Sequence, residues 1–172
     1  MRFSRRHSLL ALAGVLASPS WATPTRQAWP RGQATPPLRL PGLDGQMLDL
    51  TSLKGRPVLL NFWATWCDAC RAEMPSLQLL DTQHERDGLV TWAVNFKESV
   101  GVIQRFQAQT DFDLTVLRDA SGQASKSWGV RAFPTSILIG RDGQARWRIE
   151  GEVDWQQPPA RQWIQELIKD TR

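Results

Sequence analysis

The two cysteines of the chain are separated by two residues in the segment Trp66-Cys67-Asp68-Ala69-Cys70. An apolar run, Val58 to Trp63, precedes this segment, and residues at helical spacing follow it, so we expect Cys67 at the start of a helix. Unpaired N–H groups and the helix dipole at such a terminus favour a thiolate over a thiol. We therefore predict that Cys67 attacks a substrate disulfide and that Cys70, one turn further in, resolves the mixed disulfide.

Other uses of the same cysteines are less well supported. A structural disulfide closing a four-residue loop would add only roughly 2 kcal/mol by the chain-entropy estimate. A zinc site needs four ligands, and after residue 22 only Cys67, Cys70 and His84 could supply thiolate or imidazole groups. Covalent haem attachment needs a histidine directly after the second cysteine, where Arg71 stands. The residues themselves favour redox chemistry.

The apolar pattern predicts the elements that position this pair. We expect strands at 38–40, 46–50, 58–63, 89–95, 115–117, 135–140 and 144–149, and helices at 67–84, 100–109, 123–128 and after Pro158-Pro159. The strand, helix and strand over 58–95 make a βαβ unit with a right-handed crossover. The turn Arg141-Asp142-Gly143 joins the last two strands as a hairpin. The order is typical of a mixed α/β domain with a parallel core and an antiparallel edge.

The basic charge of the chain is concentrated at its N-terminus. The 172 residues carry a formal charge of +4, but Arg2, Arg5 and Arg6 lie in the first 22 residues, which contain no acid. The remainder has 18 basic and 17 acidic residues, spread evenly. This balance does not indicate a nucleic-acid partner. The length and the 41% hydrophobic content suit one globular domain.

Residues 1–22 have the pattern of an export signal. A basic stretch leads into the apolar run Leu9 to Ala17, and Ser20-Trp21-Ala22 supplies a cleavage site. The apolar run is too short for a stable membrane span. The segment Ser4 to Leu9 is also similar to a twin-arginine signal, although Ser8 stands where that pattern favours Phe. We expect a signal peptide over 1–22, a Pro-rich linker over 23–37, the folded domain over 38–172 and a periplasmic location.

Three further segments carry a resemblance to a known family. The run Asn61 to Pro75 is similar to the active-site segment of TlpA/ResA-like thiol–disulfide oxidoreductases in the thioredoxin superfamily. Gly129 to Thr135 resembles their cis-proline loop, and Ile139 to Gly143 resembles the hairpin after it. The resemblance implies a thioredoxin-like α/β fold, with a central mixed sheet flanked by helices and an N-terminal β-hairpin. It also implies dithiol–disulfide exchange through a Cys67–Cys70 disulfide, with no bound cofactor or metal.

The resemblance extends to the residues around the cysteines. Thioredoxins carry a buried acid six residues before the first cysteine, where this chain has Asn61, and the family pattern indicates Glu73 as the functional acid instead. Trp66, Phe133 and Pro134, the last with a cis bond before it, are expected to contact substrate, although ordinary packing explains Phe133 equally well. Glu98 could approach the site, but a solvated loop acid is the simpler interpretation.

The resulting hypothesis is a protein-disulfide reductase that acts on cysteine pairs of exported proteins. Apocytochrome c before haem attachment and copper-site assembly proteins or oxidase subunits are the expected substrates. A membrane thiol–disulfide electron donor would regenerate the dithiol, with transient membrane association, and we expect a monomer. The alternatives are a thiol peroxidase of the same superfamily, although Leu60 and Ala64 stand where peroxidases carry Pro and Thr, and a copper-binding assembly chaperone.

Overall fold

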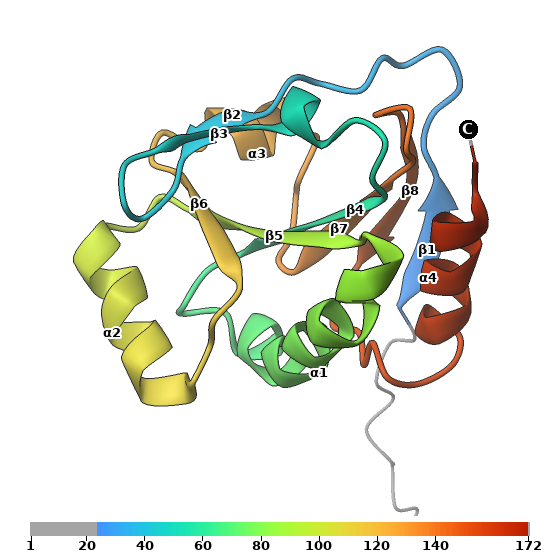
Figure 1. Ribbon diagram of the computed structural model, residues 1–172. Coiled ribbons are helices and arrows are strands. Elements are labelled where there is room, and N and C mark those ends of the chain that lie inside the picture. The colour runs from blue at the N-terminus through green and yellow to red at the C-terminus, as the bar shows by residue number, and fades with distance from the viewer. Residues whose placement is uncertain (1–23, 172) are drawn as a thin grey trace, which may run out of the picture.

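In the computed structural model, which describes residues 24–171, a six-stranded sheet in the order β1-β8-β7-β4-β5-β6 crosses the molecule (Figure 1). The parallel strands are β4 (Val58–Trp63), β5 (Val90–Phe96) and β6 (Thr115–Asp119), and the antiparallel strands are β7 (Thr135–Ile139), β8 (Ala145–Glu150) and β1 (Thr25–Ala28). A separate hairpin consists of β2 (Arg39–Pro41) and β3 (Met47–Asp49). The expected mixed sheet and N-terminal hairpin are confirmed.

The helices are α1 (Asp68–His84), α2 (Val100–Thr110), α3 (Gln123–Ser127) and α4 (Ala160–Lys169), with 3-10 turns η1 (Leu50–Leu53) and η2 (Glu85–Asp87). Figure 1 shows α1 and α2 on one side of the sheet and the β2–β3 hairpin with α3 on the other. Among residues 24–171, none of the helices combines the length and the apolar character needed to cross a membrane.

Strand β4 is buried along its whole length because both of its faces are covered. Leu59 and Trp63 belong to the core cluster shared with α1, α2 and α4, whereas Leu60 and Phe62 belong to the cluster beneath the hairpin and α3. Side chains alternate between the faces of a strand, so Asn61 lies on the same face as Leu59 and Trp63. This parity directs a polar residue of β4 toward the active-site helix.

The expected linker over 23–37 differs from the structure. Thr25–Ala28 forms the edge strand β1, paired antiparallel with β8, and Trp29 is buried against Trp128 with ring centroids 5.9 Å apart. The folded domain thus begins before residue 38. The pairing of β1 with the edge of β8 and the packing of Trp29 on Trp128 hold this proline-rich segment against the sheet. The expected signal peptide, residues 1–22, lies outside the described residues.

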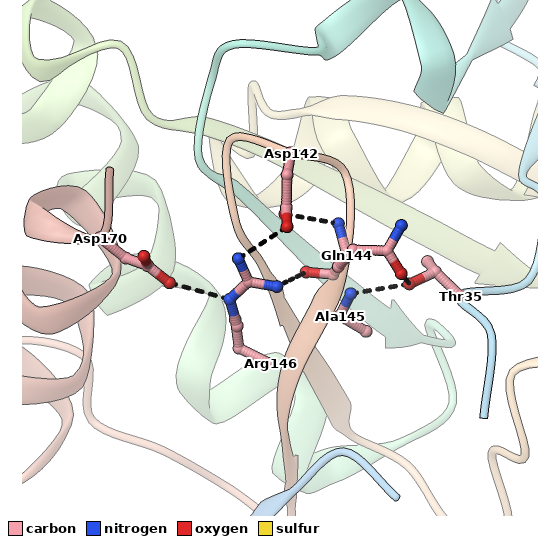
Figure 2. Close-up of polar contacts among 6 residues, drawn as sticks. All are labelled: Thr35, Asp142, Gln144, Ala145, Arg146 and Asp170. Carbon is pink, nitrogen blue, oxygen red and sulfur yellow. Dashed lines mark hydrogen bonds and ion pairs between the residues drawn. The ribbon is translucent and has the colours of Figure 1, made fainter. Parts of the chain in front are cut away.

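The β7–β8 hairpin is fastened by a polar cluster (Figure 2). Arg146 donates from Nε to Asp170 Oδ2 at 2.8 Å and pairs through its second terminal nitrogen with Asp142 Oδ2 at 3.0 Å. Thr35 Oγ1 accepts from the Ala145 N–H at 2.8 Å. The cluster therefore joins the N-terminal segment, the hairpin and the end of α4. It lies at the opposite end of the sheet from the start of α1, since β7 runs antiparallel to β4.

Candidate active site

Cys67 and Cys70 form a disulfide at the N-terminus of α1, with their Cα atoms 5.2 Å apart. Cys67 is the N-cap residue, and its Sγ accepts a hydrogen bond from the Cys70 N–H at 3.1 Å. Cys67 is 8% exposed, whereas Cys70 is fully buried. The expected helix start is confirmed, and Cys67 is the more exposed cysteine of the pair.

An aromatic surface flanks the disulfide. Trp66 is 62% exposed and meets the Phe133 ring edge-on, with centroids 5.9 Å apart. Phe133 also packs on Phe96, with centroids 5.0 Å apart. The Phe133–Pro134 bond is cis, as the resemblance implies. The loop before β7 and the residue before Cys67 thus present aromatic rings to each other at the surface.

Glu73 lies one helical turn after Cys70 and is only 2% exposed. Burial raises the pKa of Glu73 to about 8, against the opposing effect of hydrogen bonds from Val153 and Asn61, and nearby Glu152 adds to the rise. The cause is desolvation, which disfavours the charged carboxylate. Glu73 can therefore exchange a proton near neutral pH, which is the property that a general acid or base requires.

The partners of Glu73 come from three distant segments. Asn61 Nδ2 of β4 lies 2.5 Å from Glu73 Oε1 and 3.0 Å from Ser136 Oγ of β7. The Val153 N–H, in the loop after β8, donates to Glu73 Oε2 at 2.9 Å. The sequence identified Asn61 as a departure from thioredoxins but gave Ser136 and Val153 no role. A polar residue at an inward-facing strand position was the available signal for Ser136.

Glu98 is half-buried and holds the loop before Cys67, which corrects its interpretation as a solvated acid. Its carboxylate accepts hydrogen bonds from the Thr65 N–H at 2.8 Å, the Thr65 hydroxyl at 2.6 Å and Asn95 Nδ2 at 2.7 Å. The strand β5 ends at Phe96, so the following loop brings Glu98 to the end of β4. Three donors on one carboxylate fix the backbone two residues before Cys67.

One ion pair lies at the surface next to Cys67. Asp68 follows Cys67 directly, its side chain is 95% exposed, and it lies 3.3 Å from an Arg71 guanidinium nitrogen. These two residues also border a groove of about 670 Å³ between α1 and α2, whose apolar wall includes Leu79 and Phe106. Over the described part of the chain, no group of three or more His, Cys, Asp or Glu side chains is placed to hold a metal ion.

Comparisons with known proteins agree with this geometry. Residues 31–148 match the model of the AhpC/TSA family. The chain is 35% identical over 121 residues to thiol-disulfide oxidoreductase ResA of Bacillus thuringiensis subsp. konkukian, covering 70% of each chain. A protein assigned as thiol:disulfide interchange protein DsbE from Chlorobium tepidum superposes with a TM-score of 0.73 and 31% identity, covering 80% of this chain and 96% of the other.

A secreted disulfide oxidoreductase of Mycobacterium tuberculosis, homologous to E. coli DsbE, superposes with a TM-score of 0.60 and 25% identity, covering 76% of this chain and 93% of the other. Together these similarities show the family. The chain belongs to the AhpC/TSA family and, within the thioredoxin superfamily, to the TlpA/ResA-like thiol–disulfide oxidoreductases. It is a protein thiol–disulfide oxidoreductase whose redox pair is Cys67 and Cys70.

Proposed function

We propose that this TlpA/ResA-like oxidoreductase works in the periplasm and reduces disulfide bonds of exported proteins. The observation that carries the proposal is the asymmetry of the pair, with Cys67 reaching the surface and Cys70 enclosed beside a buried acid. The signal pattern of residues 1–22 and the similarity to a secreted oxidoreductase support the location. Apocytochrome c before haem attachment and copper-site assembly proteins or oxidase subunits are the substrates that fit this role.

The reaction is two thiol–disulfide exchanges. The Cys67 thiolate attacks one sulfur of the substrate disulfide, forms a mixed disulfide and expels the other substrate sulfur as a thiolate, which takes a proton from water. The Cys70 thiol then loses its proton and attacks Cys67 Sγ. The Cys67–Cys70 bond forms, the second substrate sulfur leaves as a thiolate and is protonated, and two electrons have passed to the substrate.

In this scheme Glu73 takes the Cys70 proton, because it is the buried acid one turn away on the same helix. Its raised pKa suits both uptake and release of a proton near neutral pH. Trp66 and Phe133 contact the substrate, and the backbone before Pro134 pairs with an extended substrate segment. A thiol–disulfide electron donor in the membrane then reduces the pair again through transient contact with a monomeric enzyme.

Substrate trapping tests the proposal directly. In Cys70→Ser the mixed disulfide has no resolving thiol and accumulates, so exported proteins become covalently joined to Cys67 and can be identified after non-reducing purification. Cys67→Ser is the matched control and traps none of them. Equal trapping by both variants contradicts the assignment of nucleophile and resolving thiol.

The match to the AhpC/TSA family favours one second candidate, a thiol peroxidase. Leu60 and Ala64, both fully buried, occupy the positions where such peroxidases carry proline and threonine. Hydrogen peroxide consumption driven by dithiothreitol distinguishes the two, beside insulin reduction as the reductase assay. We expect insulin reduction without peroxide turnover, and a copper(I) titration of the reduced protein tests the chaperone alternative in the same samples.

A further inference from the structure

Hydrogen-bond donors meet both carboxyl oxygens of Glu73. Asn61 Nδ2 is 2.5 Å from Oε1, and the Val153 N–H donates to Oε2 at 2.9 Å. These two bonds suit a carboxylate, which only accepts hydrogen bonds. A protonated Glu73 carries an O–H donor of its own, which would face a second donor at either oxygen. The arrangement is therefore complementary to one protonation state and unfavourable to the other.

Both states of Glu73 matter near neutral pH. Burial raises its pKa to about 8, so the protonated acid is abundant at pH 7. Among the described residues, Glu152 in the loop after β8 is the other charged group that acts on Glu73, and it favours protonation. The neighbours from β4 and β7, Asn61 and Ser136, are neutral, and Cys67 and Cys70 of the oxidised chain are joined in the disulfide.

The Asn61 amide has an unused acceptor. Its Nδ2 donates to both Glu73 and Ser136 Oγ, whereas its Oδ1 is buried without a hydrogen-bond partner. A half-turn about the Cβ–Cγ bond exchanges the positions of Oδ1 and Nδ2. Oδ1 would then accept from a protonated Glu73 and from the Ser136 hydroxyl.

We propose that the Asn61 amide inverts as Glu73 gains or loses its proton. Nδ2 donates to the carboxylate and to Ser136 in one state, and Oδ1 accepts from the carboxylic acid and from Ser136 in the other. The serine hydroxyl can serve both states because it is a donor and an acceptor. Asn61 makes two side-chain hydrogen bonds in each state, so the buried proton is exchanged by rotating one side chain.

Asn61 is thus a positioning residue for Glu73. Without the inversion, the O–H of protonated Glu73 would face a donor at the oxygen that carries it, in a buried site, and an unsatisfied buried group costs about 1 to 3 kcal/mol. With it, neither β4 nor β7 has to move. This inference deepens the role that the proposed function gives to Glu73 and rests on that function for its catalytic meaning, whereas the inversion itself is a property of the folded, oxidised chain.

Nuclear magnetic resonance of the oxidised, isotope-labelled protein tests the inversion. The Glu73 side-chain carbon follows its titration between pH 6 and 10, and nuclear Overhauser contacts locate the Asn61 amide protons. We expect contacts between these protons and the Ser136 Hβ atoms above the Glu73 midpoint, and their loss below it with the same midpoint. Contacts that persist unchanged on both sides of the midpoint overturn the proposal.

Glu73→Gln provides a matched variant with no titration. A glutamine at position 73 can accept from Val153 and donate to Asn61, as the protonated acid does, so we expect Asn61 in the inverted orientation at every pH. Retention of the Ser136 contacts in this variant would contradict the proposal. Asn95 is an internal control, because its Nδ2 donates to Glu98, which two Thr65 donors also hold.

We expect the Asn95 amide to keep its orientation throughout the titration. If both amides change together, the response is a general rearrangement and the specific coupling to Glu73 is wrong. None of these readouts uses turnover, so their failure leaves dithiol–disulfide exchange intact. Conversely, failure of the trapping experiment with Cys70→Ser would remove the proposed function without affecting the amide measurement.

Discussion

Two acid-containing sites lie at opposite ends of strand β8. At its start, Arg146 lies between Asp142 and Asp170. In the loop after it, the Val153 N–H donates to Glu73, whose other carboxyl oxygen contacts the Asn61 amide. At the first end, burial opposes ionisation of Asp142, but the Gln144 N–H and the Arg146 guanidinium outweigh it and hold its pKa below the ordinary value. At the second end, burial dominates and raises the pKa of Glu73 to about 8.

This contrast separates two uses of a carboxylate, one exposed and one buried. A cation beside Asp142 and Asp170 keeps charges in place, and the cluster fastens the N-terminal segment and α4 to the hairpin (Figure 2). Neutral donors around Glu73 leave its charge free to change with pH. Within one domain, the degree of burial and the partner of the acid together decide whether it holds a structural ion pair or exchanges a proton.

Replacing Glu73 tests this difference most strongly. The pKa of Glu73 is about 8 in the folded protein and 4.5 in the unfolded chain, so folding takes up a proton between these values. The stability conferred by the neutral acid is complete below pH 4.5 and is lost progressively as pH rises to 8. Glu73→Gln should remove this slope and exceed the parent by a few kcal/mol at pH 9.

Urea unfolding of the oxidised protein at pH 5, 7 and 9 measures the effect. The parent and Glu73→Gln should have similar stability at pH 5 and diverge as the pH rises. If Glu73→Gln keeps the pH dependence of stability seen in the parent, ionisation of Glu73 does not destabilise the fold. The contrast between Glu73 and Asp142 would then be wrong.

Replacing Arg146 tests the cluster at the start of β8. Arg146→Met leaves Asp142 and Asp170 facing each other without a cation and should lower the free energy of unfolding by about 2 to 3 kcal/mol at pH 7. Insulin reduction should be unchanged, since the cluster lies at the far end of the sheet. Arg105→Met, which removes an exposed charge on α2, is the matched control and should change stability little.

The sequence predicted the parts of this molecule that rest on local patterns. The apolar run of β4, the helix start at Cys67 and the cis bond at Pro134 are confirmed. The edge strand β1 has no alternating pattern, and its pairing with β8 joins residues more than a hundred positions apart, so a linker was expected there. Hydrophobic periodicity specifies which faces are buried but not which distant segments share an edge.

The same limit explains what was missed around the disulfide. Glu73 was found because the family pattern includes it, but its contact with Val153 spans 80 positions and depends on where a loop returns after β8. Glu98 was assigned to solvent because a loop acid has no local partner, whereas the parallel pairing of β4 and β5 brings it to Thr65. Roles that arise from tertiary contacts of backbone N–H groups leave no residue-type signal in the sequence.

Glu98 is a second acid near the disulfide, and its role is to hold Thr65 rather than to exchange a proton. Glu98→Ala removes two hydrogen bonds from Thr65, in the segment before Cys67, and one from Asn95 of β5, and should lower stability by about 1 to 2 kcal/mol. It should also slow the reaction of reduced Cys67 with a model disulfide by about threefold to tenfold, because the helix start is less firmly held. Thr65→Val removes only the hydroxyl bond and should show a smaller effect on both quantities.

The pH dependence distinguishes Glu98 from Glu73. Glu98→Ala should keep the fall in stability between pH 4.5 and 8, because that slope belongs to Glu73. Stopped-flow measurement of the thiol reaction and urea unfolding over the same pH range provide both values. Loss of the slope in Glu98→Ala would contradict the assignment of this pH dependence to Glu73 alone.

The smallest effect is expected from Asp68, whose charge is next to Cys67 in the chain but almost fully exposed and paired with Arg71. For a protein that acts as a disulfide reductase, we expect a reduction potential of roughly −200 to −270 mV for the parent, in the range of glutaredoxins and thioredoxin. Removing a negative charge stabilises the Cys67 thiolate and therefore the reduced form, so Asp68→Asn should shift the potential toward a more oxidising value. Solvent screening limits this shift to about 10 mV.

Arg71→Gln is the matched control and should shift the potential in the opposite direction, since it leaves Asp68 unpaired. Equilibration with glutathione buffers, followed by the fluorescence of exposed Trp66, measures all three potentials. A shift above about 30 mV in Asp68→Asn corresponds to about 1.4 kcal/mol and would make the exposed acid a regulator of the disulfide. The distinction between buried Glu73, which exchanges a proton, and exposed Asp68, whose charge is screened by solvent, would then be wrong, because an exposed acid would also control the active-site chemistry.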